Sequence, residues 1–279
     1  MSHDKSAVRK ILDQAKAAGR EALTAPEARG VCEAYGITIP KEGVATSADE
    51  AAKLAEKVGF PVVMKIVSPQ ILHKTEAGGV IVGVKSAQHA KEAYATVVGN
   101  ARKYDGKAEI LGVQVQQMLS GGQEVIIGAV TDPAFGKLVA FGLGGILVEV
   151  LKDITFRLAP ASKEDALSML DGIQAAEILR GVRGAKPVDR AALSDMIERV
   201  SVLVADFPEI SEMDLNPVFA TDHGATAADV RIVLNFSPAP PRDRPSQAAI
   251  VEKMNRIMKP KALAVIGASA ENEIGRAHV

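Results

Sequence analysis

The sequence of 279 residues contains no tryptophan, a single cysteine and only 4% aromatic residues. With Cys32 alone, neither a disulfide framework nor a cysteine zinc site can form within the chain, and its apolar helical setting predicts a buried thiol. The formal net charge of −1 indicates no basic surface of the kind that nucleic acid requires. No apolar run approaches the ~20 residues that span a bilayer, and the start MSHDKSAVRK lacks the apolar segment of a signal peptide. These absences predict a cytoplasmic protein that binds neither nucleic acid nor membrane.

What the sequence does contain is enough apolar content, 47%, to bury a sizeable core and to form more than one folded unit. Helical spacing predicts an N-terminal helix within residues 1–22. Capping boxes that begin at Thr24 and Ser47 predict two more helices, which end at Gly36 and Gly59. Further helices are predicted over residues 86–104, after Ser162, and after Asp189, where the apolar stripe is Leu193, Met196, Ile197, Val200, Leu203 and Val204.

Side chains that could take part in binding or catalysis are concentrated in the stretch from residue 59 to 84, in a loop between two β-branched runs. Lys65 is a charge inside the apolar strand 62–67, and an unpaired ammonium group taken out of water is costly, so an anionic ligand is an expected partner. Gly78 and Gly79 could bring backbone N–H groups close to an anion. The alternative is a Lys65 side chain that reaches solvent above an ordinary hairpin with a Gly-Gly turn.

Arg157 lies between Phe156 and Leu158 and is a second charge in an apolar strand. Either a carboxylate or a phosphate should meet it, and we count it among the expected phosphate contacts. The remaining pattern predicts strands over residues 111–118, 124–130, 137–141 and 146–150, with turns at 131–136 and 142–145.

Oxygen-bearing side chains share one face of a later strand. Period 2 places Glu212, Asp214 and Asn216 together, and Pro217 is expected to end the strand. Three such side chains would repel or stay unsatisfied unless they are solvated or bind a cation, and Mg²⁺ prefers oxygen ligands. Asp229, which opens the next predicted strand at 229–234, could complete the site. The alternative is a solvated edge strand.

Three motifs in order resemble one family. The runs VVMKIVSPQILHKTEAGGV at 62–80, FGLGGILVEVLKDITFRLAP at 141–160 and EMDLNPV at 212–218 resemble the ATP-grasp portion of the ADP-forming acyl-CoA synthetases, the acetate–CoA ligase group related to succinyl-CoA synthetase. The resemblance covers about residues 20–236. It implies an α+β ATP-grasp fold of two subdomains, 23–112 and 113–236, with the nucleotide between two antiparallel sheets.

The resemblance also implies ligands and the residues that bind them. Asn216 and Asp229 would hold Mg²⁺, with Asp214 beside them, and CoA would be a cosubstrate of the complete protein. The implied contacts to ATP are Lys65, Gly78 and Gly79 for the phosphates, Gln117, Met118 and Leu119 for adenine, and Glu124 for the ribose.

His73 corresponds to a loop histidine that carries a phosphoryl group in this family. It lies between the Lys65 strand and the two glycines, where a neutral imidazole nitrogen could reach the γ-phosphate in line. Lys74 could offset the developing charge, and Glu76 could orient the ring. An exposed loop histidine without chemistry is the alternative.

The C-terminal part is expected to be a fragment of a further domain. Residues 237–246 read as a proline-rich linker, followed by a short helix at 247–258. KALAVIGAS at 261–269 resembles the first strand and glycine turn of a CoA-binding Rossmann domain, which is expected to begin over 261–273. IGRAHV at 274–279 resembles the translation of a sequencing adapter. The CoA-binding and ligase domains are therefore expected partners, in the same chain or in another.

The reaction implied by the resemblance joins a carboxylic acid to CoA while ATP becomes ADP and phosphate, through a phosphohistidine. Two other functions stay open at this point. One is a noncatalytic nucleotide-sensing module of a larger acyl-CoA-linked or acetyltransferase-fused protein. The other is a CoA-independent ATP-grasp ligase that joins a carboxylate to an amine, against which the KALAVIGAS segment argues.

Overall fold

The computed structural model of the chain describes residues 3–71, 73–144, 153–182, 184, 186–237 and 246–262. The chain divides into two compact units, Met1–Phe236 and Ser237–Val279. Among the described residues, the first unit contains two antiparallel sheets with their helices, and the second contains one helix.

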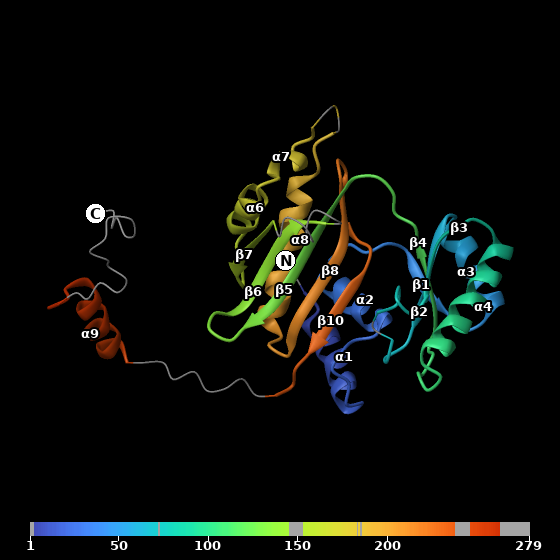
Figure 1. The fold of residues 1–279 in the computed structure, drawn as a ribbon, viewed down its shortest axis with the longest axis horizontal. Coiled ribbons are helices and arrows are strands. Elements are labelled where there is room, and N and C mark those ends of the chain that lie inside the picture. Colours follow the sequence, from blue (N-terminus) through green and yellow to red (C-terminus); the bar gives the residue numbers. More distant parts are fainter. Residues whose placement is uncertain are drawn as a thin grey trace, which may run out of the picture. The chain divides into compact units, whose positions relative to one another are not determined.

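The smaller sheet carries the Lys65 strand. Its strands are β1 (Glu42–Ala45), β2 (Val62–Val67), β3 (Val80–Val84) and β4 (Gly112–Gln117), in the antiparallel order β1-β4-β2-β3. Helices α3 (Ala48–Val58) and α4 (Ala87–Tyr104) pack on one face (Figure 1). Val62, Met64 and Ile66 are fully buried in this core, which leaves Lys65 on the other face as the alternation predicts.

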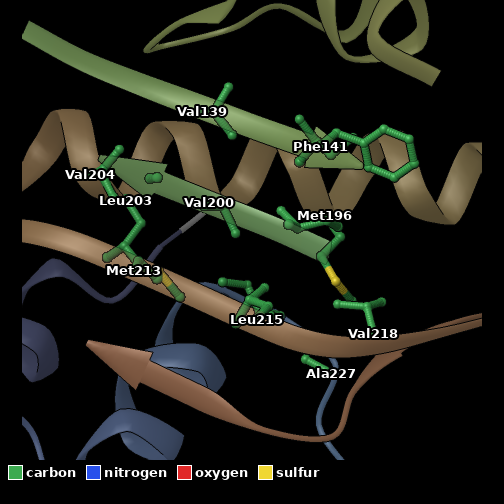
Figure 2. Packing of buried hydrophobic residues seen from close by; sticks show 14 of the residues in the cluster. Val139, Phe141, Met196, Val200, Leu203, Val204, Met213, Leu215, Val218 and Ala227 are labelled. Carbon is green, nitrogen blue, oxygen red and sulfur yellow. The ribbon is translucent and has the colours of Figure 1, made fainter. Parts of the chain in front are cut away.

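The larger sheet has six antiparallel strands: β5 (Gln123–Asp132), β6 (Gly136–Leu143), β7 (Ile154–Leu158), β8 (Ile210–Thr221), β9 (Gly224–Ala227) and β10 (Val230–Leu234). They follow the order β10-β8-β5-β6-β7, and β9 pairs with β8. Helices α6 (Lys163–Gly172) and α8 (Arg190–Asp206) pack on one face, and the short α7 (Ala176–Leu179) follows α6. Figure 2 shows Leu203, Val200 and Met196 of α8 along the same face of β8 as Met213, Leu215 and Val218, and the predicted α8 stripe is buried in full.

The two cores divide the chain differently from the expected limits at 23–112 and 113–236. Helices α1 (Lys5–Ala17) and α2 (Ala25–Ala34) bury Leu12 and Val31 in the core of the larger sheet. Strand β4 belongs instead to the smaller sheet, because it pairs with both β1 and β2. The chain therefore starts in the larger core, crosses to the smaller sheet and returns after β4.

Helix starts follow their predicted caps. The carboxylate of Glu27 accepts a hydrogen bond of 2.8 Å from the Thr24 backbone N–H, which closes the first capping box. Ser47 and Asp189 accept from the N–H groups of Glu50 and Ala192. These contacts replace hydrogen bonds that the first turn of a helix cannot make internally.

Two boundary predictions were wrong. Strand β8 does not end at Pro217 but continues to Thr221, because the register between β5 and β8 shifts there and a residue without an N–H is tolerated at a bulge. Gly142 and Leu143 belong to β6 rather than to a turn, since Gly142 pairs with Ile154. The predicted strand at 146–150 lies outside the described residues.

Of the second unit, the structure describes Ser237 and residues 246–262, which include α9 (Gln247–Met258), a helix at its predicted place, none of whose residues is buried. The linker at 238–245 and the KALAVIGAS segment from residue 263 onward lie outside the described residues. Of the helices that the structure describes, none combines the length and the apolar character needed to cross a membrane.

Candidate active site

Strand β2 brings Lys65 to the face of the smaller sheet that does not carry α3 and α4. The residue is 8% exposed, and its Nζ donates a hydrogen bond of 3.0 Å to the carbonyl oxygen of Ala228. The same Nζ lies 3.3 Å from Oδ1 of Asp229. The partner that the apolar strand requires is thus a carboxylate just before β10, and the reading of Lys65 as a side chain that reaches solvent is not supported.

The loop between β2 and β3 is closed by its own backbone. The N–H of Gly79 donates to the carbonyl oxygen of Lys74, and the N–H of Gly78 donates to that of Thr75. Both N–H groups that were expected to face an anion therefore have acceptors within the loop. The backbone geometry explains why these two positions are glycines. Gly78 has φ +60°, and a Cβ at Gly79 would lie 2.6 Å from Cγ2 of Ile66.

This loop brings His73 and Lys74 to the same cavity as the Asp229 carboxylate. The His73 side chain is 74% exposed, and its Nδ1 is 3.9 Å from Oε1 of Glu76. Lys74 is more buried, and its Nζ lies 3.4 Å from Oδ1 of Asp229. A cavity of about 370 Å³ is lined by Lys65, His73, Lys74, Thr75, Glu76, Val80, Asn216, Pro217 and Asp229.

Of the residues expected to hold magnesium, Asp214 and Asn216 lie in the middle of β8, and Asp229 lies just before β10. The backbone N–H of Asn216 donates to the carbonyl oxygen of Asp229, so the two residues are neighbours. Burial raises the pKa of Asp214, the carboxylates of Glu212 and Asp229 raise it further, and Arg231 opposes them. A cation beside Asp214 and Asp229 would relieve this repulsion.

The donor set fits magnesium in kind. Asp214, Asn216 and Asp229 offer carboxylate and amide oxygens, and Mg²⁺ is held by one or two carboxylates while it keeps several waters. The described residues contain no group of three or more histidine, cysteine, aspartate or glutamate side chains arranged around a metal.

The last residue of β4, Gln117, and the segment that follows it connect the two sheets. The N–H of Gln117 donates to the carbonyl oxygen of Lys41, and that of Met118 donates to Pro61. An adenine at this segment would have to use other backbone groups, such as those of Leu119. Glu124 lies at the start of β5 with an exposed side chain, so it is accessible to a ribose.

Arg157 is not brought to this site. It pairs across the sheet with Val139, which is fully buried beneath α8, so Arg157 lies on the helix-covered face. Its guanidinium donates to Ser168 Oγ at 2.9 Å and to the Phe156 carbonyl oxygen at 2.8 Å. Asp214 lies on the opposite face of the same sheet, because its neighbours Met213 and Leu215 fill the core.

A polar cluster that lies beside Asp229 was not predicted from the sequence. Nε2 of Gln116 donates to Oε2 of Glu42 at 2.5 Å, and Arg29 donates to the Glu42 carbonyl oxygen. Gln114 is 4% exposed, and its Oε1 has no hydrogen-bond partner among the described residues. The alternation of Gln114 and Gln116 with valines was visible, but nothing in the sequence linked them to Arg29, which lies in α2.

Comparison with known proteins agrees with this arrangement. Residues 14–234 match the ATP-grasp domain family. The β subunit of an ADP-forming acetate–CoA ligase from Pyrococcus furiosus is 50% identical over 226 residues, which are 81% of this chain and 97% of that subunit. An ADP-forming 4-hydroxybutyrate–CoA ligase from Nitrosopumilus maritimus is 48% identical over 83% of this chain, but the match spans only 33% of that protein.

A solved structure gives the same fold. It is the dinucleotide forming acetyl-coenzyme A synthetase 1 of Candidatus Korarchaeum cryptofilum in complex with coenzyme A, Ca-AMPCP and HgCl⁺, with 42% identity and a TM-score of 0.79. The match covers 81% of this chain and 99% of that one. The predicted family and the predicted α+β ATP-grasp fold with two antiparallel sheets are confirmed.

Proposed function

This chain belongs to the ATP-grasp domain family, within the group of ADP-forming acyl-CoA ligases, and from that premise we propose that it binds MgATP and transfers the γ-phosphoryl group to His73. The observation that carries the proposal is the single cavity that Lys65, His73, Lys74, Asn216 and Asp229 line together. Cations for phosphate, oxygens for magnesium and a nucleophile are all present there.

The phosphates would be bound by Lys65 and Lys74, whose ammonium groups face the cavity from β2 and from the His73 loop. Asn216 and Asp229 would hold Mg²⁺, with Asp214 beside them. When bound, Mg²⁺ neutralises charge on the β- and γ-phosphate oxygens and orients them. Glu124 would accept hydrogen bonds from the ribose, and the backbone near Leu119 would meet adenine.

His73 would act as the nucleophile. A bond forms between an imidazole nitrogen and the γ-phosphorus, the bond from that phosphorus to the bridging oxygen breaks, and ADP leaves. Glu76, 3.9 Å from the His73 ring, could accept a hydrogen bond from Nδ1 after a small movement and so hold the ring in one orientation. A related solved structure from the same Korarchaeum species is described as having its phosphohistidine segment pointing towards the nucleotide binding site.

The chemistry at the acyl group would require other domains. The match spans 97% of the β subunit of the acetate–CoA ligase but only 33% of the 4-hydroxybutyrate–CoA ligase. We therefore propose that CoA binding and acyl transfer occur in CoA-binding and ligase domains that act with this one, in the same chain or as a separate subunit. The complete enzyme would form acyl-CoA from a carboxylic acid, CoA and ATP.

The test is labelling with γ-labelled ATP and magnesium, followed by acid and alkali treatment. We expect acid-labile, alkali-stable label in the wild type and in His89→Ala, and none in His73→Ala. His89 is a suitable control because it is a partly exposed residue in the first turn of α4. Equal labelling of His73→Ala would remove His73 from the reaction, while MgATP binding without label in any variant would favour a noncatalytic nucleotide-sensing module.

A further inference from the structure

One oxygen of Asp229 meets two ammonium groups. Nζ of Lys65 lies 3.3 Å from Oδ1 of Asp229, and Nζ of Lys74 lies 3.4 Å from the same atom. Both lysines are well shielded, with side-chain exposures of 11% and 19%. Two positive charges at this depth need a counter-charge, and Asp229 is the carboxylate that both of them contact.

The two lysines reach Asp229 from different elements. Lys65 is fixed within the central part of the smaller sheet by pairing of β2 with β3 and β4, and it also donates to the Ala228 carbonyl oxygen. Lys74 belongs to the loop that carries His73, and its own carbonyl oxygen accepts from Gly79 to close that loop. The Lys74–Asp229 pair therefore ties the His73 loop to the start of β10.

These contacts conflict with the role of Asp229 in binding metal. A divalent cation at Oδ1 would lie within a few ångströms of two ammonium groups, and like charges at that distance repel. A nucleotide without metal meets the opposite obstacle, because the two lysines already have a carboxylate partner. Metal alone would leave the two lysines without a counter-charge, and nucleotide alone would leave the Asp229 carboxylate without one.

We propose, building on the function proposed above, that Lys74 is a second phosphate ligand held in reserve by Asp229, and that magnesium and nucleotide bind by exchange. In this exchange the Asp229 carboxylate would lose its contacts with both lysines and bind the metal, while Lys65 and Lys74 would bind the phosphates. Every charge keeps a partner in the bound state, and no covalent bond changes. Because Lys74 adjoins His73, the same exchange moves the nucleophile toward the γ-phosphate.

The exchange makes metal and nucleotide strongly coupled, and removing Asp229 should uncouple them. Calorimetric titration of the full chain with ADP, in MgCl₂ or in EDTA, measures this directly. We expect the wild type to bind ADP in EDTA at least about tenfold more weakly than in MgCl₂, within the usual range of coupling between two ligands. Compared with the wild type, Asp229→Asn should bind ADP more tightly in EDTA, by about fivefold or more, and more weakly in MgCl₂.

Three further variants locate the effect. Lys74→Met should bind ADP about tenfold more weakly in MgCl₂, because a charged contact to phosphate is lost. Asp214→Asn removes a nearby carboxylate that neither lysine contacts in the described residues, so it should weaken binding in MgCl₂ without the gain in EDTA. Lys91→Met is the matched control, since Lys91 pairs with Asp49 on an exposed surface, and it should match the wild type.

Two outcomes would overturn the exchange: Asp229→Asn binding ADP in EDTA no more tightly than the wild type, or Lys74→Met binding ADP in MgCl₂ as the wild type does. Thermal melts of each variant show whether it is folded. Failure of the wild type to bind ADP in MgCl₂ would overturn the proposed function as well. Binding by the wild type with unchanged Asp229→Asn behaviour would overturn the exchange alone.

Discussion

Lys65 in β2 and Arg157 in β7 look alike in the sequence, since each is a lone cation between apolar neighbours. In the structure Lys65 is 8% exposed and meets Asp229, whereas Arg157 binds Ser168 and a neighbouring carbonyl oxygen on the helix-covered face. The apolar residues next to the two cations also differ in their exposure. Ile66 is fully buried, whereas Phe156 is 49% exposed.

The difference comes from what covers each face of the two strands. Strand β2 lies inside its sheet, between β4 and β3, so its apolar face packs on α3 and α4 and its cation faces the larger sheet. Strand β7 is an edge strand, and its helix-covered face receives Arg157 instead of an apolar side chain. A charge in an apolar strand therefore predicts a partner, but the elements around the strand decide whether that partner lies in the active site.

The largest effect that separates the two strands should be on stability. Ile66→Ala removes three buried carbons beneath α3 and α4 and should lower the free energy of unfolding by about 2–5 kcal/mol. Phe156→Ala, at an exposed position, should lower it by about 0.5 kcal/mol or less. Urea denaturation of both variants tests this, and similar losses would mean that β7 is covered by a partner in solution.

The next effect should be on nucleotide binding. Lys65→Ala deletes a charged phosphate contact that is typically worth about 1.5–3 kcal/mol, so the affinity for MgATP should fall tenfold or more. Calorimetry measures the change, and Lys91→Ala on the surface is the control. An unchanged affinity would remove Lys65 from the nucleotide site and leave its pair with Asp229 as a structural contact.

Much of this arrangement was predictable from local patterns. The caps at Ser47 and Asp189 follow from the side-chain oxygens of those residues. The alternation around Lys65 and the shared face of Asp214 and Asn216 follow from the period of 2 in a strand, which tertiary packing preserved. The exact face and partner of a side chain depend on elements distant in sequence, and local patterns carry no information about those.

Three errors illustrate this limit. Arg157 was expected at the phosphates because nothing in its own strand indicates α6, which supplies Ser168. Pro217 was expected to end β8 because the bulge that tolerates it is set by the partner strand β5. The N–H groups of Gly78 and Gly79 were expected to face an anion, but the loop between them and Lys74 folds back and uses them.

The two faces of the larger sheet should also differ in their response to pH. Asp214 faces away from the helices, and its pKa is raised, so the folded protein loses stability as the pH rises through that pKa. Asp214→Asn should therefore stabilise the protein at pH 7, and this gain should shrink as the pH falls toward ~3.9, the ordinary aspartate value, where the wild-type carboxyl is itself protonated. Urea unfolding at several pH values measures it, and a gain independent of pH would assign the effect to packing.

The smallest effect should come from Arg157→Ala, which is the counterpart of Lys65→Ala. Its guanidinium contacts Ser168 on α6, which lies on the face opposite Asp214, and a carbonyl oxygen of its own strand. We expect the affinity for MgATP to stay within about twofold of the wild type, or about 0.4 kcal/mol, and the unfolding free energy to fall by about 1 kcal/mol or less. Ser168→Ala should produce a similar small loss of stability, because it removes the same hydrogen bond from the other side. A tenfold loss of MgATP affinity in Arg157→Ala but not in Ser168→Ala would show that Arg157 leaves α6 and reaches the nucleotide, so that the two cations are alike after all.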